Sequence, residues 1–164
     1  MHPMKNILVA ILVLWSCAGF SQGKNKPVKH APIKHKPKLD SAMIRRTGAD
    51  PYGMKKYVMC FLKTGPNKSL PEDSVKKIVA AHLKNIQALS NKGKLVLAGP
   101  FTDGGELEGI FILNVTTVEE AKALTDTDPG VKAGIFSVEL HPWYGSAVLM
   151  EVPLLHTKVQ AKQF

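Results

Sequence analysis

One histidine lies on the apolar side of a predicted helix, where an imidazole needs a hydrogen-bond partner or a chemical role. From Ser74 to Leu89, apolar residues recur at spacings of three and four, which predicts an amphipathic helix. His82 comes four residues after Ile78 and four before Ile86, so it shares the face expected to pack on the core. We expect His82 to act as a general acid or base. The alternative is a buried histidine that only satisfies its own hydrogen bonds.

Asp128 is the carboxylate that we expect to orient this imidazole. It opens the sequence Asp-Pro-Gly after a second predicted helix, in a segment expected to lie beside the first helix. A carboxylate there would bond one imidazole nitrogen, fix the tautomer and leave the other nitrogen for a ligand. The alternative role for Asp128 is to cap the short turn that follows it. The neighbouring Asp126 is expected to be a solvated helix end.

Three residues after the second predicted strand are candidate ligand contacts. Gly99 and Pro100 let the backbone approach a ligand closely, and Phe101 could form a wall of the pocket. A plain strand terminator and a core aromatic are the alternatives. We expect no metal and no cofactor, because His82 and Asp128 provide two ligands whereas a specific metal site needs three or four.

The elements that would position these residues follow a simple order. Strands are predicted at 56–63, 95–98, 108–115 and 135–140, the last of them extending towards Trp143, and helices at 72–91 and 118–125. This order, β-α-β-β-α-β, predicts an α+β, ferredoxin-like antiparallel sheet with both helices on one face.

The second face of this sheet is also predicted to be apolar. The first strand carries Val58 and Cys60 on one parity, and Met59 and Phe61 on the other. A sheet that is apolar on both faces should be covered on both, and no second layer is evident in the chain. We therefore expect a homodimer that packs sheet to sheet. A monomer that binds something large across the sheet is the alternative.

The N-terminal residues predict export. A short basic start is followed by the apolar run 7–15 and a small polar stretch, so we expect residues 1–22 to be a secretory signal peptide. Residues 14–17 also resemble a lipobox, and the alternative is therefore lipidation of Cys17 and anchoring to a membrane. The remaining thiol, Cys60, is expected to be a small buried hydrophobe.

The net charge of +9 is concentrated in one segment. Residues 22–55 hold nine Lys/Arg against two Asp, whereas residues 56–150 carry ten charges of each sign. We expect a basic, Pro/Lys/His-rich disordered linker at 23–55, a neutral domain at 56–150 and a C-terminal tail at 151–164. A neutral domain lacks the electrostatic footprint for phosphate backbones, so nucleic acid is not an expected partner.

Three blocks in order resemble the YCII-related family. They are Ala81-His82-Leu83, the segment Gly93 to Pro100, and the segment Asp128 to Gly134. The resemblance implies a dimeric α/β barrel and an active site at His82 and Asp128. One member of that family is a dehydrochlorinase, and few others have a known reaction. We therefore expect an exported small-molecule-binding protein, with lyase or hydrolase chemistry at a His-Asp pair. The alternatives are a ligand- or metal-binding dimer without turnover, and a structural dimer.

Overall fold

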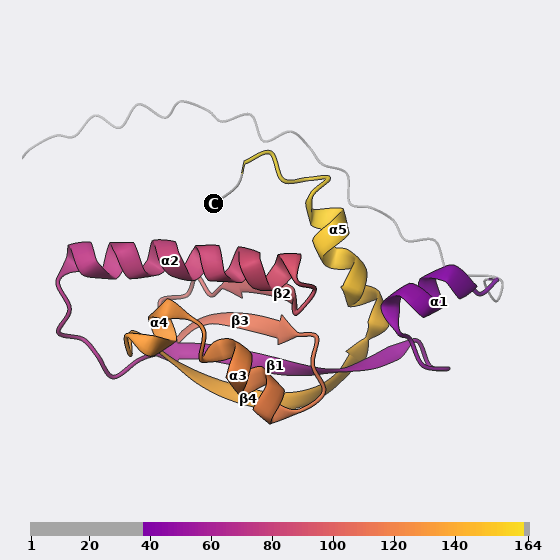
Figure 1. Ribbon diagram of the computed structural model, residues 1–164, viewed down its shortest axis with the longest axis horizontal. Coiled ribbons are helices and arrows are strands. Elements are labelled where there is room, and N and C mark those ends of the chain that lie inside the picture. Colours follow the sequence, from indigo (N-terminus) through magenta and orange to yellow (C-terminus); the bar gives the residue numbers. More distant parts are fainter. Residues whose placement is uncertain (1–37, 163–164) are drawn as a thin grey trace, which may run out of the picture. The chain divides into compact units, whose positions relative to one another are not determined.

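A four-stranded antiparallel sheet forms the centre of the molecule (Figure 1). The computed structural model describes residues 38–162. The strands are β1 (Met54–Thr64), β2 (Leu95–Pro100), β3 (Leu107–Leu113) and β4 (Phe136–Ser146), in the spatial order β2-β3-β1-β4. The central strand β1 pairs with both β3 and β4, and Cys60 lies opposite Phe111 on one side and Leu140 on the other.

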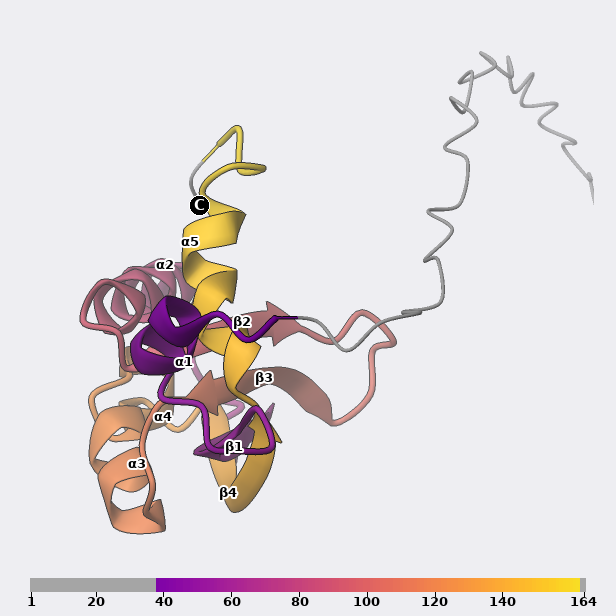
Figure 2. The ribbon, with the colours of Figure 1, turned by 90° about the vertical axis from the view of Figure 1, so that its right-hand side faces the viewer.

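Two helices lie on one side of this sheet (Figure 2). Helix α2 (Glu72–Asn91) begins with two acidic residues, which favour the positive end of the helix dipole. It ends just before Gly93, whose φ of 65° is a left-handed conformation suited to glycine. Helix α3 (Val118–Thr125) is capped by Thr117, whose hydroxyl accepts from the Glu120 amide. The predicted order β-α-β-β-α-β and the α+β class are thus confirmed.

The main hydrophobic core lies between the sheet and these helices. Its buried members are Val58, Cys60, Leu62, Leu89, Leu95, Phe111, Leu113, Val115 and Ala121. Alternate residues of β1 face it, as the period of two along a strand requires. We call this side of the sheet the helix face.

The opposite side, which we call the second face, is covered at one end by the chain itself. Buried Tyr57, Val96 and Ile112 pack there with Leu149 and Met150, which belong to the 3-10 helix η1 (Ala147–Glu151). The prediction that the chain has no cover for this face is therefore wrong at that end. The sequence signal was weak because η1 is short and buries its apolar residues only against the folded sheet.

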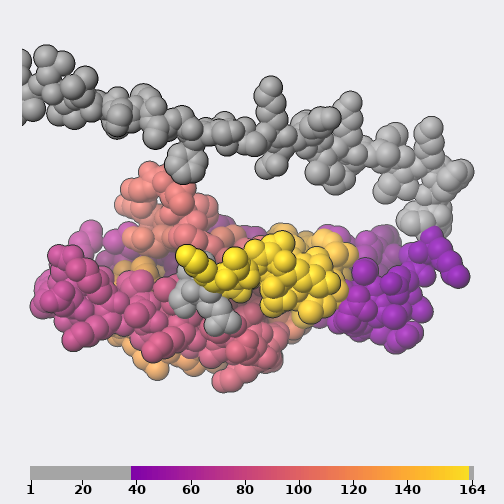
Figure 3. Space-filling model, turned by 90° about the horizontal axis from the view of Figure 1, so that it is seen from above, coloured from indigo at the N-terminus to yellow at the C-terminus, as the bar shows by residue number. Residues whose placement is uncertain are grey.

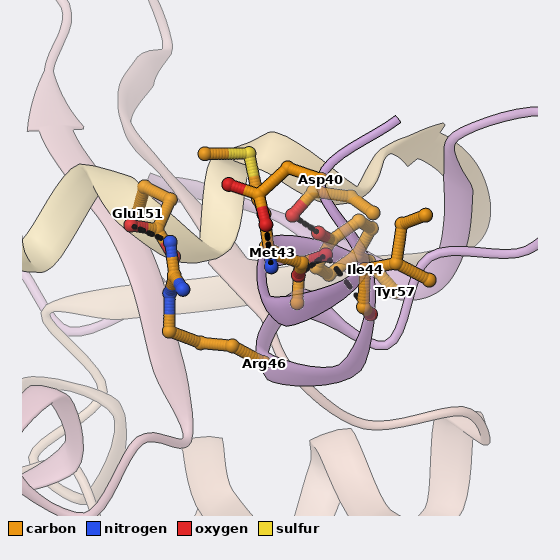
Figure 4. A network of polar contacts seen from close by, with 8 residues as sticks. Asp40, Met43, Ile44, Arg46, Tyr57 and Glu151 are labelled. Carbon is orange, nitrogen blue, oxygen red and sulfur yellow. Dashed lines mark hydrogen bonds and ion pairs between the residues drawn. The ribbon is translucent and has the colours of Figure 1, made fainter. Parts of the chain in front are cut away.

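A helix also forms inside the range predicted as linker. Helix α1 (Ser41–Thr47) is capped by the Asp40 side chain, which accepts from the Met43 amide. Arg46 forms a two-pronged ion pair with Glu151 of η1, with Nε–Oε1 at 2.7 Å and Nη2–Oε2 at 3.2 Å (Figure 4). The disordered linker predicted for 23–55 is therefore corrected over this part, because α1 is tied to η1 by tertiary contacts that local composition does not reveal.

The predicted tail also contains structure. Helix α5 (Val152–His156) follows η1 directly, and this C-terminal segment lies on the molecular surface, in yellow in Figure 3. The predicted signal peptide at 1–22, with Cys17, and the linker residues up to 37 lie outside the described residues. Within residues 38–162, no helix has the length and apolarity needed to cross a membrane.

Candidate functional site

His82 and Asp128 meet beneath helix α2. The Nδ1 atom of His82 lies 2.7 Å from Oδ2 of Asp128. The two side chains keep 11% and 1% of their surface exposed, respectively. His82 comes from the middle of α2, and Asp128 immediately precedes the short helix α4 (Pro129–Lys132), which contacts α2. The structure therefore brings together two residues that are 46 positions apart in the chain.

Asp128 is held in place by backbone as well as by side chains. Its Oδ1 atom accepts from the amides of Gly130 at 2.8 Å and Val131 at 3.4 Å, which makes it the N-cap of α4. Its Oδ2 atom also accepts from Nδ2 of Asn85 at 3.3 Å. Capping and orientation of His82 were considered as alternatives for Asp128, and the same carboxylate does both, one oxygen for each.

The pKa of the Asp128 carboxyl lies below its ordinary value. Burial by itself would raise this pKa, but the hydrogen bond and charge of His82, the Gly130 amide and the Asn85 amide outweigh it. Asp128 is therefore an anion at neutral pH. Since a carboxylate only accepts hydrogen bonds, Nδ1 of His82 is the atom that carries a proton.

Two aromatic rings enclose the imidazole. Phe111 of β3 stacks on it with ring centroids 6.0 Å apart, and Phe136 of β4 lies at 5.0 Å with the planes tilted by 57°. The ring of Phe136 also occupies the space beside Gly130, where an added Cβ would lie 2.4 Å from Cδ2 of that ring. Glycine at 130 is thus what lets Phe136 reach His82.

The second nitrogen of His82 remains available. No group of residues 38–162 is hydrogen-bonded to Nε2, and this atom is not sealed from solvent. The imidazole thus has one fixed nitrogen and one uncommitted nitrogen. This is the arrangement that a general acid or base requires, and it differs from a structural histidine, which bonds through both nitrogens.

Two hollows on the described surface lie away from His82. One of about 240 Å³ is lined by residues that include Tyr57, Trp143 and Tyr144. Another of about 420 Å³ lies among residues that include Lys63 and Ser137. Neither is lined by His82 or Asp128.

The three expected ligand contacts are distributed over both faces of the sheet. Ala98 pairs with Phe111, so Pro100, two residues further along β2, lies on the helix face as Phe111 does. Gly99 lies on the second face by the same alternation. Phe101 follows the strand and is 39% exposed. Their role in ligand binding stays a prediction.

Sequence reasoning missed three residues of the site. Asn85 follows His82 by three positions, a spacing that places both on one face of a helix, and this spacing was the signal that could have revealed it. Phe111 and Phe136 lie in predicted strands, but nothing local indicated which helix residue they would meet. Within residues 38–162, no group of three or more His, Cys, Asp or Glu side chains could hold a metal ion.

The thiol of Cys60 lies in the core beneath this site. It is fully buried, and burial, followed by the charge of Asp128, raises the pKa of Cys60 to about 12. A thiol in this state is a poor nucleophile, because the thiolate is the reactive form.

A second histidine–carboxylate pair lies on the second face. Nε2 of His141 is 2.7 Å from Oε1 of Glu139, and Glu139 also pairs with Lys63. These side chains are 42–52% exposed. The nitrogen–oxygen distance is the same as in the His82–Asp128 pair, but this second pair is largely exposed to water in the single chain.

The comparisons place the chain in a family. The model of the YCII-related domain matches residues 56–144, which is more than half of the chain, and the chain belongs to this family. No curated protein matches the chain.

A solved structure is similar to about half of the chain. It is 5-chloro-2-hydroxyhydroquinone dehydrochlorinase from Burkholderia phenoliruptrix in complex with 2,5-dihydroxybenzoquinone. The identity is 23%, the match covers 52% of this chain and 92% of that one, and the TM-score is 0.40.

Proposed function

We propose that this protein binds a small organic molecule beside His82 and that His82, oriented by Asp128, is its general acid or base. The reaction would be of the lyase or hydrolase type. The observation that carries this proposal is the asymmetry of the imidazole. A buried carboxylate holds Nδ1 at 2.7 Å, while Nε2 has no hydrogen-bond partner among residues 38–162.

The chemistry follows from that asymmetry. In the neutral state Nε2 has a free lone pair, so it can take a proton from a bound molecule or from a water that attacks it. The imidazolium that forms carries its charge next to the Asp128 carboxylate, which stabilises it. The same proton can then pass from Nε2 to a leaving group, which returns His82 to its starting state. Phe111 and Phe136 provide apolar contacts to the imidazole ring.

Binding without turnover is the second candidate. It is supported by the enclosure of the imidazole, whose side chain is only 11% exposed and lies between Phe111 and Phe136. A ligand would then have to displace side chains or use space that forms in an assembly. Ligand binding and turnover therefore need separate measurements.

A ligand screen with three proteins tests both candidates. Fragments that raise the melting temperature of the wild type are tested again on His82→Gln and on His156→Gln, which changes an exposed histidine of α5 that belongs neither to the His82 site nor to the expected dimer contact. We expect hits that are lost in His82→Gln and kept in His156→Gln. The hits and their close analogues are then assayed for conversion. A folded His82→Gln variant that keeps all measurable turnover would contradict the acid–base role of His82. Fragments that bind His82→Gln as well as the wild type would contradict a binding site beside His82.

We also propose that the uncovered part of the second face packs against a second copy of the chain. The support is the half-buried row Met59, Phe61 and Ile110 on that face. Sedimentation velocity should give a dimer for the wild type and a monomer for Phe61→Lys, with Lys77→Glu on α2 as the control. A monomeric wild type at high concentration would contradict this.

Export is the remaining part of the proposal. It rests on the sequence of residues 1–22, with lipid anchoring through Cys17 as the alternative. N-terminal sequencing and mass measurement of protein from a bacterial host would separate cleavage from lipidation. An intact N-terminus in the cytoplasm would contradict both.

A further inference from the structure

Each oxygen of the Asp128 carboxylate accepts two hydrogen bonds. Oδ1 accepts two backbone amides of α4, and Oδ2 accepts from His82 and from Asn85. A carboxylate offers about four acceptor positions, so these four donors occupy them. No acceptor position of Asp128 is therefore left for a proton, and these hydrogen bonds hold the carboxylate in its orientation towards the imidazole.

The orientation of the Asn85 amide is determined by its neighbours. Nδ2 lies 3.3 Å from Oδ2 of Asp128, and Oδ1 lies 3.2 Å from the hydroxyl of Thr127. That hydroxyl also lies 2.7 Å from the Leu124 carbonyl, so its hydrogen is shared between two acceptors. Turning the amide over would place its oxygen against the carboxylate oxygen, which is repulsive. Nδ2 is therefore the end that faces Asp128.

We propose that Asn85 is a positioning residue of the site, which holds Oδ2 of Asp128 on Nδ1 of His82 and keeps the proton on the imidazole. This deepens the proposed function and rests on it, because it determines which imidazole nitrogen a ligand meets. Without Asn85, the Asp128 carboxylate keeps its hold on α4 through Oδ1 but can pivot about that contact. Nδ1 then loses its partner for part of the time, and the two tautomers of His82 come closer in energy.

The test follows the Nδ1 proton of His82 by NMR in the full chain labelled with ¹⁵N-histidine. His82→Gln assigns the signal, because its resonances disappear in that variant. In the wild type we expect a single tautomer with Nδ1 protonated and Nε2 bare, and slow exchange of this proton with water. In Asn85→Leu we expect exchange at least about tenfold faster, because a hydrogen bond to a charged group is lost. A share of the other tautomer should also appear.

Two further variants make the result decisive. Asn85→Ala removes the same donor without adding bulk and should change exchange in the same direction. Gln87→Leu removes the exposed amide that bonds Asn91 on the same helix and should leave the His82 signals unchanged. Thermal melting shows that each variant is folded.

A wild type in which Nε2 carries the proton would overturn the inference. Wild-type exchange rates in both folded Asn85 variants would also overturn it. These measurements need no ligand, so they are separate from the proposed function. An Asn85-dependent proton in a chain that binds nothing at His82 refutes the proposed function alone.

Discussion

Two histidine–carboxylate pairs of equal length lie on opposite faces of one sheet. His82 and Asp128 are 2.7 Å apart on the helix face, and His141 and Glu139 are 2.7 Å apart on the second face. The first pair is 11% and 1% exposed, and the second is 52% and 44% exposed. The distances alone do not distinguish the two pairs, whereas their surroundings do.

The buried pair contributes more to the stability of the protein than the exposed pair does. Water can replace either partner of the exposed pair, so such a pair contributes about 0–1 kcal/mol to stability. The Asp128 carboxylate is only 1% exposed, so water cannot replace His82 there, and its other hydrogen bonds come from the backbone of α4 and from Asn85. Removing one partner of a buried pair leaves the other unsatisfied, which costs far more. Burial thus makes one pair a candidate site, and the other a surface contact.

Asp128→Asn should destabilise the protein much more than Glu139→Gln does. We expect Asp128→Asn to lower the free energy of unfolding by about 3 kcal/mol, because it breaks a buried pair. In the monomer, Glu139→Gln should change it by less than about 1 kcal/mol, because that pair is exposed in the single chain. Urea denaturation of both variants measures the difference. Equal losses in the two variants would show that burial does not separate the pairs.

The second prediction concerns the ring that packs on His82. An added Cβ at Gly130 would lie 2.4 Å from the Phe136 ring, whereas one at Gly99 meets nothing within 4 Å. Gly130→Ala should therefore cost about 1–3 kcal/mol through overpacking. Gly99→Ala should be close to neutral in the same urea experiment. The His82 signals should shift in the first variant alone, and unchanged His82 signals in Gly130→Ala would contradict the placement of Phe136.

The loss of folding stability at low pH should differ between the wild type and Asp128→Asn, by less than the two effects above. The pKa of Asp128 is lower in the folded chain than its ordinary value, so its contribution is fully present above the unfolded value of about 3.9. That contribution is lost as the pH falls through the folded pKa. The urea midpoint of the wild type should therefore fall more steeply below pH ~4 than that of Asp128→Asn. If the urea midpoints of the two proteins fall equally steeply below pH ~4, Asp128 is not a source of this pH dependence.

The smallest expected signal is the reactivity of Cys60. Its thiol is fully buried and its pKa is raised to about 12, so it should not react with a thiol reagent at neutral pH in a Cys17→Ser background. It should react fully once the chain is unfolded in urea. Rapid modification of the native protein would mean that the helix face beneath the His82 pair is open to solvent.

Much of the framework could be predicted from local patterns. Helix α2 was expected at 72–91 and lies at Glu72–Asn91, because its apolar period and its terminal signals are all local. The order of strands and helices along the chain follows from the same patterns. The close approach of His82 and Asp128 was expected from the resemblance to the YCII-related family, and the order of the elements was compatible with it, although no pattern could show the 2.7 Å contact itself.

The rest depends on contacts between distant segments. Helices α1 and α5 and the 3-10 helix η1 are short and pack against already folded parts, so their sequences carry little signal. The end of β4 was placed too early, since the strand was expected to extend towards Trp143 but runs to Ser146 in pairing with β1. Phe136 joins the site because Gly130 leaves room for its ring, which is a matter of packing rather than of sequence period.

The most direct test of the account is a crystal structure of the full chain soaked with the strongest hit of the fragment screen. The account predicts electron density for the molecule within hydrogen-bond distance of Nε2 of His82, with the His82–Asp128 bond retained. Density confined to the hollow beside Trp143 or to the one beside Lys63, with no ligand at His82, would contradict it.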